Sequence, residues 1–178
     1  MEKIRVLGVD PSLRNTGLAI ITYNSELPPT NADAFSASHC QVLINPAKFT
    51  GTDAILNMLD MIYKEAEKPC YQEVETILVE SPPLMFNKTW SGGAISSIAH
   101  ISGGAVALLG IEKAYLFRPN EWNKTRKKEI THNQTISFLG NPEKWHYEKM
   151  VKAEKSMEHI LDAASMALWW IKSNYLED

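Results

Sequence analysis

Near its start the sequence runs Ile4-Arg5-Val6-Leu7-Gly8-Val9-Asp10, an apolar stretch that stops at the turn signal Pro11-Ser12. A short run rich in β-branched residues and bounded by a turn predicts a buried strand, and this one ends in a carboxylate. A second apolar run over residues 17–23 follows so closely that we expect a tight antiparallel hairpin. The fold is therefore expected to begin with two paired strands and an acid at the end of the first.

Outward from this hairpin, apolar patterns predict further strands and helices. Strands are expected near 38–44, over 76–80 and over 113–117. Helices are expected from Asp53 to before Pro69, over 92–109, within 121–140 as one helix or two short ones, and over 157–174. Strands that come first as a meander and then alternate with helices indicate an α/β or α+β layer with a mixed sheet.

Length and composition narrow the class of protein. The 178 residues, 44% of them hydrophobic and 22% charged, predict one globular domain over residues 1–178 with a core of its own. The two cysteines, Cys40 and Cys70, lack a C-x-x-C spacing and are expected to be reduced. We identify no apolar run near the roughly 18 to 20 residues that span a bilayer, and no signal-peptide core at the start of the sequence. We therefore expect a cytoplasmic protein without membrane contact.

Three acids occupy positions where a charge is costly. Asp10 and Glu80 each end an apolar strand, and Asp162 lies within an apolar helix. Buried carboxylates are usually paired or bound to metal. If the first and fourth strands are neighbours and the last helix crosses them, the three acids converge, and their oxygens would suit Mg²⁺ or Mn²⁺. Two such ions would activate water for phosphodiester hydrolysis.

Each acid taken alone has a simpler explanation. Asp10 before Pro-Ser is more often a turn or helix cap, and Glu80 alone is similar. Asp162 is harder to explain in this way, because the apolar helix around it offers little solvation. His159 lies three residues before Asp162 and so shares its helical face; it is a candidate metal ligand or general base, or else an ordinary core or surface histidine.

A basic tract follows the fifth strand. Residues 118–128 contain five basic side chains and one acid, a net charge of +4, which leaves −7 for the rest of a chain whose formal charge is −3. The overall charge argues against a protein that coats nucleic acid, but a local tract beside acids fits phosphate contact. An ordinary solvated helix face is the alternative. The candidate DNA contacts in this tract are Arg118, Lys124, Arg126, Lys127 and Lys128.

The loop after Glu80 adds aromatic side chains to the expected site. Phe86, Lys88 and Trp90 follow the two prolines of this loop. An aromatic ring beside a lysine can stack on unpaired bases at a branch point, so Phe86 and Lys88 are candidate DNA contacts. Core packing of Phe86 or Trp90 is an equally weighted alternative.

Four stretches resemble, in the same order, the motifs of the RuvC family of Holliday-junction resolvases. They are residues 6–19, 77–80, 115–122 and 159–164. The resemblance implies an RNase H-like fold with a mixed five-stranded sheet flanked by helices, a homodimer, and Mg²⁺-dependent symmetric nicking of four-way DNA junctions. It also implies that Asp10, Glu80 and Asp162 hold the metals, two ions per site with Mn²⁺ able to substitute, and that His159 fills the family's variable position.

Some features differ from the family's pattern. Ser12 stands where the family often has Gly, and the loop between the second and third strands is longer than usual. These differences are typical of a divergent, phage-type member, which would act in the host cytoplasm. The small residues of 92–109 would let this helix lie close to the sheet, which is the more common use of such helices, or close to a second subunit. A two-fold symmetric junction calls for two active sites related by that symmetry, which a homodimer supplies.

Three other functions compete with junction resolution. The spacing from Asp10 to Gly17 also resembles the phosphate loop of the actin and sugar-kinase superfamily, but a chain without internal duplication has no room for two lobes. A non-catalytic binding module of the same fold would be expected to lose one or more of the acids. A nuclease acting on RNA or on other branched DNA is a closer alternative.

Overall fold

The computed structural model describes residues 3–82, 92–123, 127–140, 145 and 154–176. Its strands form one five-stranded sheet in the order β3-β2-β1-β4-β5. Hydrogen bonds join β1, β2 and β3 as an antiparallel meander, whereas β4 and β5 run parallel to β1. The strands are β1 (Lys3–Asp10), β2 (Asn15–Asn24), β3 (Phe35–Ile44), β4 (Thr76–Glu80) and β5 (Ala114–Phe117).

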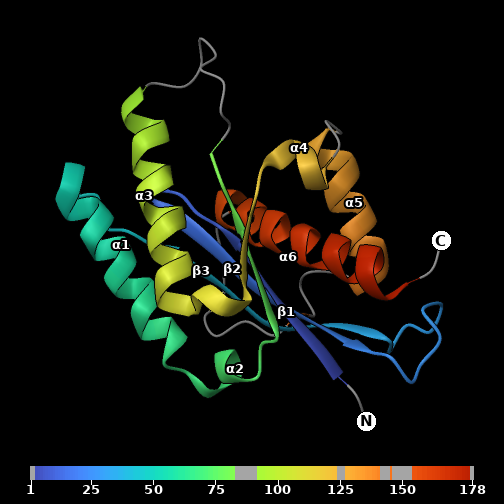
Figure 1. Ribbon diagram of the computed structural model, residues 1–178. Coiled ribbons are helices and arrows are strands. Elements are labelled where there is room, and N and C mark those ends of the chain that lie inside the picture. Colours follow the sequence, from blue (N-terminus) through green and yellow to red (C-terminus); the bar gives the residue numbers. More distant parts are fainter. Residues whose placement is uncertain (1–2, 83–91, 124–126, 141–144, 146–153, 177–178) are drawn as a thin grey trace.

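Helices cover both faces of this sheet (Figure 1). On one face lie α1 (Gly51–Ala66) and α3 (Gly92–Leu109), and on the other α6 (Glu154–Tyr175) crosses β1 and β2 with α5 (Lys128–Leu139) against it. The shorter elements are α2 (Pro69–Gln72), the single 3-10 turn η1 (Ile111–Lys113) and α4 (Pro119–Trp122). The predicted fold class, a mixed five-stranded sheet flanked by helices, is confirmed, and the tract 121–140 contains the end of one short helix and a separate second helix.

The alternation of side chains along each strand creates two cores. In β1, Val6 packs toward α6, whereas Leu7 and Val9 pack toward α1 and α3. In β4, Leu78 belongs to the α6 core and Val79 to the opposite one. Because successive side chains of a strand point to opposite faces, the face on which each strand-terminal acid lies is fixed by the apolar residues before it.

One expectation about α3 was wrong. This helix has 18 residues, none of them Asp, Glu, Lys or Arg, and a mean hydropathy of 1.4, so by length and composition it could cross a membrane. The glycines and serines lower the apolar content of residues 92–109, but without any charged side chain the mean hydropathy stays high. In the structure α3 buries Ile101, Ala105 and Leu109 against the core that it shares with α1, and much of the rest of its surface is exposed.

Candidate functional site

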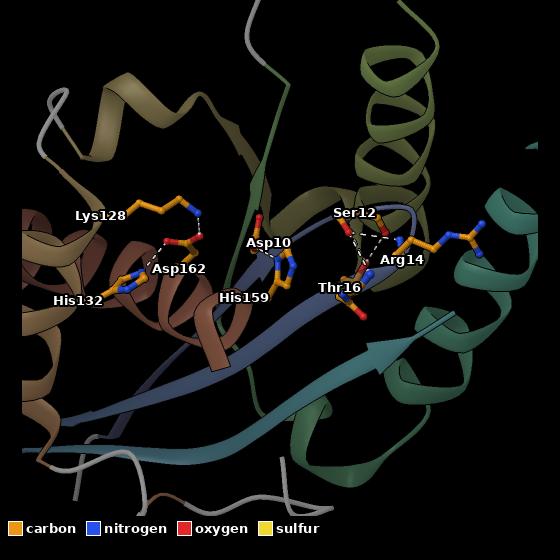
Figure 2. Close-up of polar contacts among 9 residues, drawn as sticks. Asp10, Ser12, Arg14, Thr16, Lys128, His132, His159 and Asp162 are labelled. Carbon is orange, nitrogen blue, oxygen red and sulfur yellow. Dashed lines mark hydrogen bonds and ion pairs between the residues drawn. The ribbon is translucent and has the colours of Figure 1, made fainter. Parts of the chain in front are cut away.

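The turn after Asp10 is held by its own side chains. Ser12 Oγ accepts hydrogen bonds from the backbone N–H groups of Arg14 and Asn15, at 3.3 and 3.0 Å. Thr16 Oγ1 accepts one from the N–H of Ser12 and donates one to its carbonyl oxygen, at 3.2 and 3.1 Å (Figure 2). Short hydroxyl side chains stabilise turns in this way. The end of β1, and with it Asp10, is therefore held in place from the turn side.

Asp10 and Glu80 end neighbouring parallel strands on the same face of the sheet. Val9 pairs with Val79 in the register of β1 and β4, so the acids that follow them lie at the same level. Both acids continue the side-chain row that packs toward α6. Ser102 of α3 donates a hydrogen bond of 2.9 Å to the carbonyl oxygen of Glu80 and anchors the end of β4.

Two glycines let α6 lie directly on the strands. A Cβ atom at Gly8 would lie 1.9 Å from the carbonyl oxygen of Ala163, and one at Gly17 would lie 2.1 Å from that of His159. Any larger residue would therefore collide with the backbone of the helix. This close approach brings the first turns of α6, which carry His159 and Asp162, over the ends of β1 and β4.

His159 pairs with the first acid. Its Nδ1 lies 2.5 Å from Oδ2 of Asp10, and both side chains are largely shielded from solvent. The hydrogen bond to Asp10 raises the pKa of His159 above its usual value, although burial opposes this. Burial raises the pKa of Asp10, and the hydrogen bond from His159 only partly offsets it. The two groups therefore form one hydrogen-bonded acid–imidazole pair.

Glu80 is affected by the other two acids. Burial, together with the charges of Asp10 and Asp162, raises the pKa of Glu80 to about 8. Lys128 and the side chain of Trp122 act in the opposite direction but more weakly. At neutral pH and without a bound cation, Glu80 therefore holds a proton, because a third negative charge at this place is unfavourable.

Asp162 is held by two side chains of α5. His132 Nε2 lies 2.8 Å from Oδ1 of Asp162, and the ammonium group of Lys128 pairs with Oδ2 (Figure 2). Burial alone would raise the pKa of Asp162, but these two hydrogen bonds lower it below its usual value. Burial also opposes the charge of Lys128, yet Asp162, Asp10 and Glu80 together raise the pKa of this lysine.

His132 was missed by the sequence analysis, and Lys128 was considered only as a phosphate contact. The two residues are four positions apart, which places them on one face of a helix. That spacing was the available signal, but their partner Asp162 lies 30 or more residues away. No local pattern therefore pointed to the contact.

The candidate DNA contacts are only partly described by the structure. Arg118 is exposed at the start of α4, and Lys127 is exposed just before α5. Lys128 is 66% exposed along its side chain, but its ammonium group is engaged by Asp162. The remaining candidates lie outside the described residues: Phe86, Lys88, Lys124 and Arg126, together with Trp90.

The carboxylate oxygens of the site suit a hard divalent cation, but those of Asp10 and Asp162 already pair with other side chains. Among the residues that the structure describes, no three His, Cys, Asp or Glu side chains are arranged as a metal-ligand set. Instead His159 pairs with Asp10, and Asp162 pairs with Lys128 and His132. Carboxylate oxygens are the ligands that Mg²⁺ and Mn²⁺ prefer. The site therefore fits such a cation on condition that the cation replaces Lys128 beside Asp162.

Comparison with known proteins shows the fold. No protein-family model and no curated protein sequence matches the chain. Among solved structures, RuvC of Thermus thermophilus in complex with a Holliday junction substrate aligns with a TM-score of 0.66 and 15% identity, over 97% of this chain and 98% of that one. Fowlpox virus resolvase in complex with Holliday junction DNA aligns with a TM-score of 0.55 and 13% identity, over 97% and 99% of the two chains.

The yeast mitochondrial Holliday junction resolvase Ydc2 gives a TM-score of 0.53 and 16% identity, over 97% of this chain and 82% of its own. All three likenesses span nearly the whole of this chain. The protein therefore has a RuvC-like, RNase H-like fold.

Proposed function

We propose that this protein is a metal-dependent endonuclease that resolves four-way DNA junctions by paired symmetric nicks. The observation that supports this most directly is the position of the three acids. Asp10 and Glu80 end adjacent strands, and α6 carries Asp162 to the same end of the sheet. The arrangement occurs in a fold shared with three Holliday junction resolvases, two of them with junction DNA in the structure.

Divalent cations would be held by Asp10, Glu80 and Asp162, with His159 beside the first of them. We propose Mg²⁺, with Mn²⁺ able to substitute, and two ions per site. Bound there, the ions would supply an activated water and a stabilised leaving oxygen for phosphodiester hydrolysis. His159 orients Asp10 through Nδ1 and is placed to hold a proton there. Glu80 gives up its proton when positive charge enters the site, because the cation then offsets the charges of the other acids.

Cationic side chains next to the acids would hold the DNA backbone. Arg118 and Lys127 are exposed near the start of α4 and α5, on the side of the sheet where Asp162 lies. Phosphate contacts from such residues fix the position of a duplex without reading its sequence. We propose that they act with Lys124, Arg126 and, once it is displaced, Lys128, and that Phe86 and Lys88 approach the branch point.

The proposed substrate also calls for two active sites. A four-way junction is approximately two-fold symmetric, and two like strands are cut by two sites related by that symmetry, so we propose a homodimer. The long uncharged face of α3 is the surface that we propose for the contact. Its exposed positions include Ser96, His100, Gly103 and Ala107, which repeat at helical spacing.

Replacement of the first acid tests the proposed function. Asp10→Asn keeps the size of the side chain but removes its charge, and we expect junction cleavage to fall by at least about 100-fold, since metal ions supply several kcal/mol of transition-state stabilisation. Binding of a synthetic four-way junction should persist. Asp53→Asn, at an exposed position in the first turn of α1, is the matched control and should cleave normally.

Two outcomes would contradict the proposal. Cleavage by Asp10→Asn at the rate of the unmodified protein would show that the acids are not the reacting site. A preference of the unmodified protein for linear duplex, other branched DNA or an RNA hybrid over the four-way junction would show that the substrate class is wrong.

A further inference from the structure

Both carboxylate oxygens of Asp162 are occupied by side chains of α5. His132 Nε2 lies 2.8 Å from Oδ1, and Lys128 pairs with Oδ2. Because an ionised carboxylate only accepts hydrogen bonds, His132 carries its proton on Nε2 and donates it. The two partners approach from the same helix and engage different oxygens (Figure 2).

The two partners differ in their freedom to leave. The side chain of His132 is 12% exposed and that of Asp162 is 4% exposed, whereas Lys128 is 66% exposed. An ammonium group on a flexible four-carbon stem can move into solvent by rotating its own bonds. The enclosed imidazole, on a shorter side chain, has less room to rotate away. Oδ2 is thus the exchangeable oxygen of Asp162, and Oδ1 is the fixed one.

A second contact in the same interface keeps His132 in register with Asp162. One turn further along both helices, Thr135 Oγ1 and Ser165 Oγ lie 2.7 Å apart and are buried. Successive polar contacts of this kind determine how α5 is aligned along α6. The position of the imidazole therefore follows from helix packing rather than from a mobile surface contact.

We propose that His132 is a positioning residue of the metal site, which holds Oδ1 of Asp162 so that Oδ2 faces a divalent cation taking the place of the Lys128 ammonium group. This inference rests on the proposed function. Hydrogen bonds to the far side of a ligating group orient it, and their loss typically weakens metal binding by about 10- to 100-fold. His132 acts through Asp162 and touches neither the cation nor the DNA.

Calorimetric titration of the full chain with Mn²⁺ alone, at fixed pH, tests this role. His132→Phe keeps a ring but removes the donor, and we expect Mn²⁺ affinity to fall by about 10- to 100-fold. In His132→Gln an amide N–H reaches the same region, so affinity should stay within about threefold of the unmodified protein. Ser137→Ala removes an exposed hydroxyl of the same helix, which donates to the carbonyl oxygen of Gln134 and contacts no carboxylate, and should leave Mn²⁺ affinity unchanged.

Asp162→Asn, titrated in parallel, separates the failure of this inference from the failure of the proposed function. If the unmodified protein binds no Mn²⁺, both are overturned. If it binds Mn²⁺ and Asp162→Asn weakens binding but His132→Phe does not, only the role of His132 is overturned.

His132→Ala keeps the test decisive if His132→Phe does not fold, because it also removes the donor. Mn²⁺ binding by folded His132→Ala about tenfold weaker than that of Ser137→Ala supports the positioning role. Binding at the level of Ser137→Ala would contradict a role as hydrogen-bond donor.

Discussion

Burial and neighbouring charge act in the same direction on Glu80. Burial raises the pKa of this carboxyl to about 8, and the Asp10 and Asp162 carboxylates contribute to the shift. In the unfolded chain the same group titrates near 4.5. The folded protein therefore binds a proton at Glu80 over a pH range in which the unfolded chain has already released it.

The free energy of unfolding of the metal-free protein should consequently fall as the pH rises from about 4.5 through about 8. Each unit of pKa difference corresponds to about 1.4 kcal/mol, so we expect a loss on the order of a few kcal/mol between pH 5 and pH 8.5. The raised pKa of His159 acts in the same direction, since its proton also stabilises the folded state. Urea unfolding in the presence of a chelator measures this dependence.

Glu80→Gln mimics the protonated carboxyl and should flatten the pH dependence of the free energy of unfolding. Glu112→Gln, at an exposed position of η1, is the control and should leave it unchanged. If the stability of the metal-free protein rises over this pH range, or if Glu80→Gln has no effect on it, the assignment of the pH dependence to Glu80 is wrong.

At the scale of secondary structure, the distance between α6 and the sheet decides whether the site exists. Gly8 and Gly17 lie on the strands directly below the carbonyl groups of Ala163 and His159. A helix packed over ordinary side chains would lie further out and would carry His159 and Asp162 away from Asp10. The two glycines are thus part of the site, although neither contributes a functional group.

Gly8→Ala and Gly17→Ala should each destabilise the fold by about 1–3 kcal/mol, because the added methyl group meets helix backbone that cannot rotate away. Cleavage should fall by more than the lost stability explains, since a displacement of about 1 Å in a catalytic group can cost roughly 100-fold in rate. Chemical denaturation and cleavage assays on the folded fraction measure the two effects.

Gly93→Ala is the matched control for this pair. A Cβ atom there meets nothing within 4 Å, and the residue lies in the exposed first turn of α3. We expect its stability to change by no more than about 1 kcal/mol, the full range of helix propensity between Gly and Ala. Wild-type stability of Gly8→Ala would show that α6 can shift without cost.

The elements that could be predicted from the sequence are those with a local pattern. Both acid-ended strands have alternating or continuous apolar residues and a proline stop, and the helix around Asp162 has a wide apolar face, so these elements were predicted. Their convergence was predicted only on the condition that the two strands are neighbours and that the helix crosses them, which local patterns do not specify. The contact of α5 with Asp162 could not be predicted, because α5 is weakly patterned and its partner is distant in the chain. The exposure of α3 depends on tertiary packing, which its composition does not specify.

At the scale of the whole molecule, α3 presents a long surface that neither the sheet nor α1 covers. It carries no Asp, Glu, Lys or Arg, and Ser96, His100, Gly103 and Ala107 are exposed along it. Small residues at helical spacing permit the close approach of a second helix. A second copy of the chain would cover this face and would supply the second active site that a symmetric junction requires.

Gly103→Arg should therefore convert a dimer into a monomer. A Cβ atom at Gly103 would meet nothing within 4 Å and the position is exposed, so we expect the folded monomer to tolerate the substitution. A buried arginine between two helices would weaken dimerisation by about 100-fold or more, since an unpaired buried charge costs several kcal/mol. Analytical ultracentrifugation measures the dissociation constant. Leu56→Arg, at an exposed apolar position of α1, is the control and should remain dimeric.

Cleavage of a cruciform plasmid connects this assembly to the proposed function. Two sites acting on one junction linearise the plasmid, whereas a monomer leaves a nicked circle, so Gly103→Arg should shift the product from linear to nicked while Mn²⁺ binding stays at the level of the unmodified protein. A monomeric unmodified protein on junction DNA would contradict the dimer. If Gly103→Arg instead remains dimeric and linearises the plasmid, the two copies meet through another surface, and the exposed face of α3 needs a different explanation.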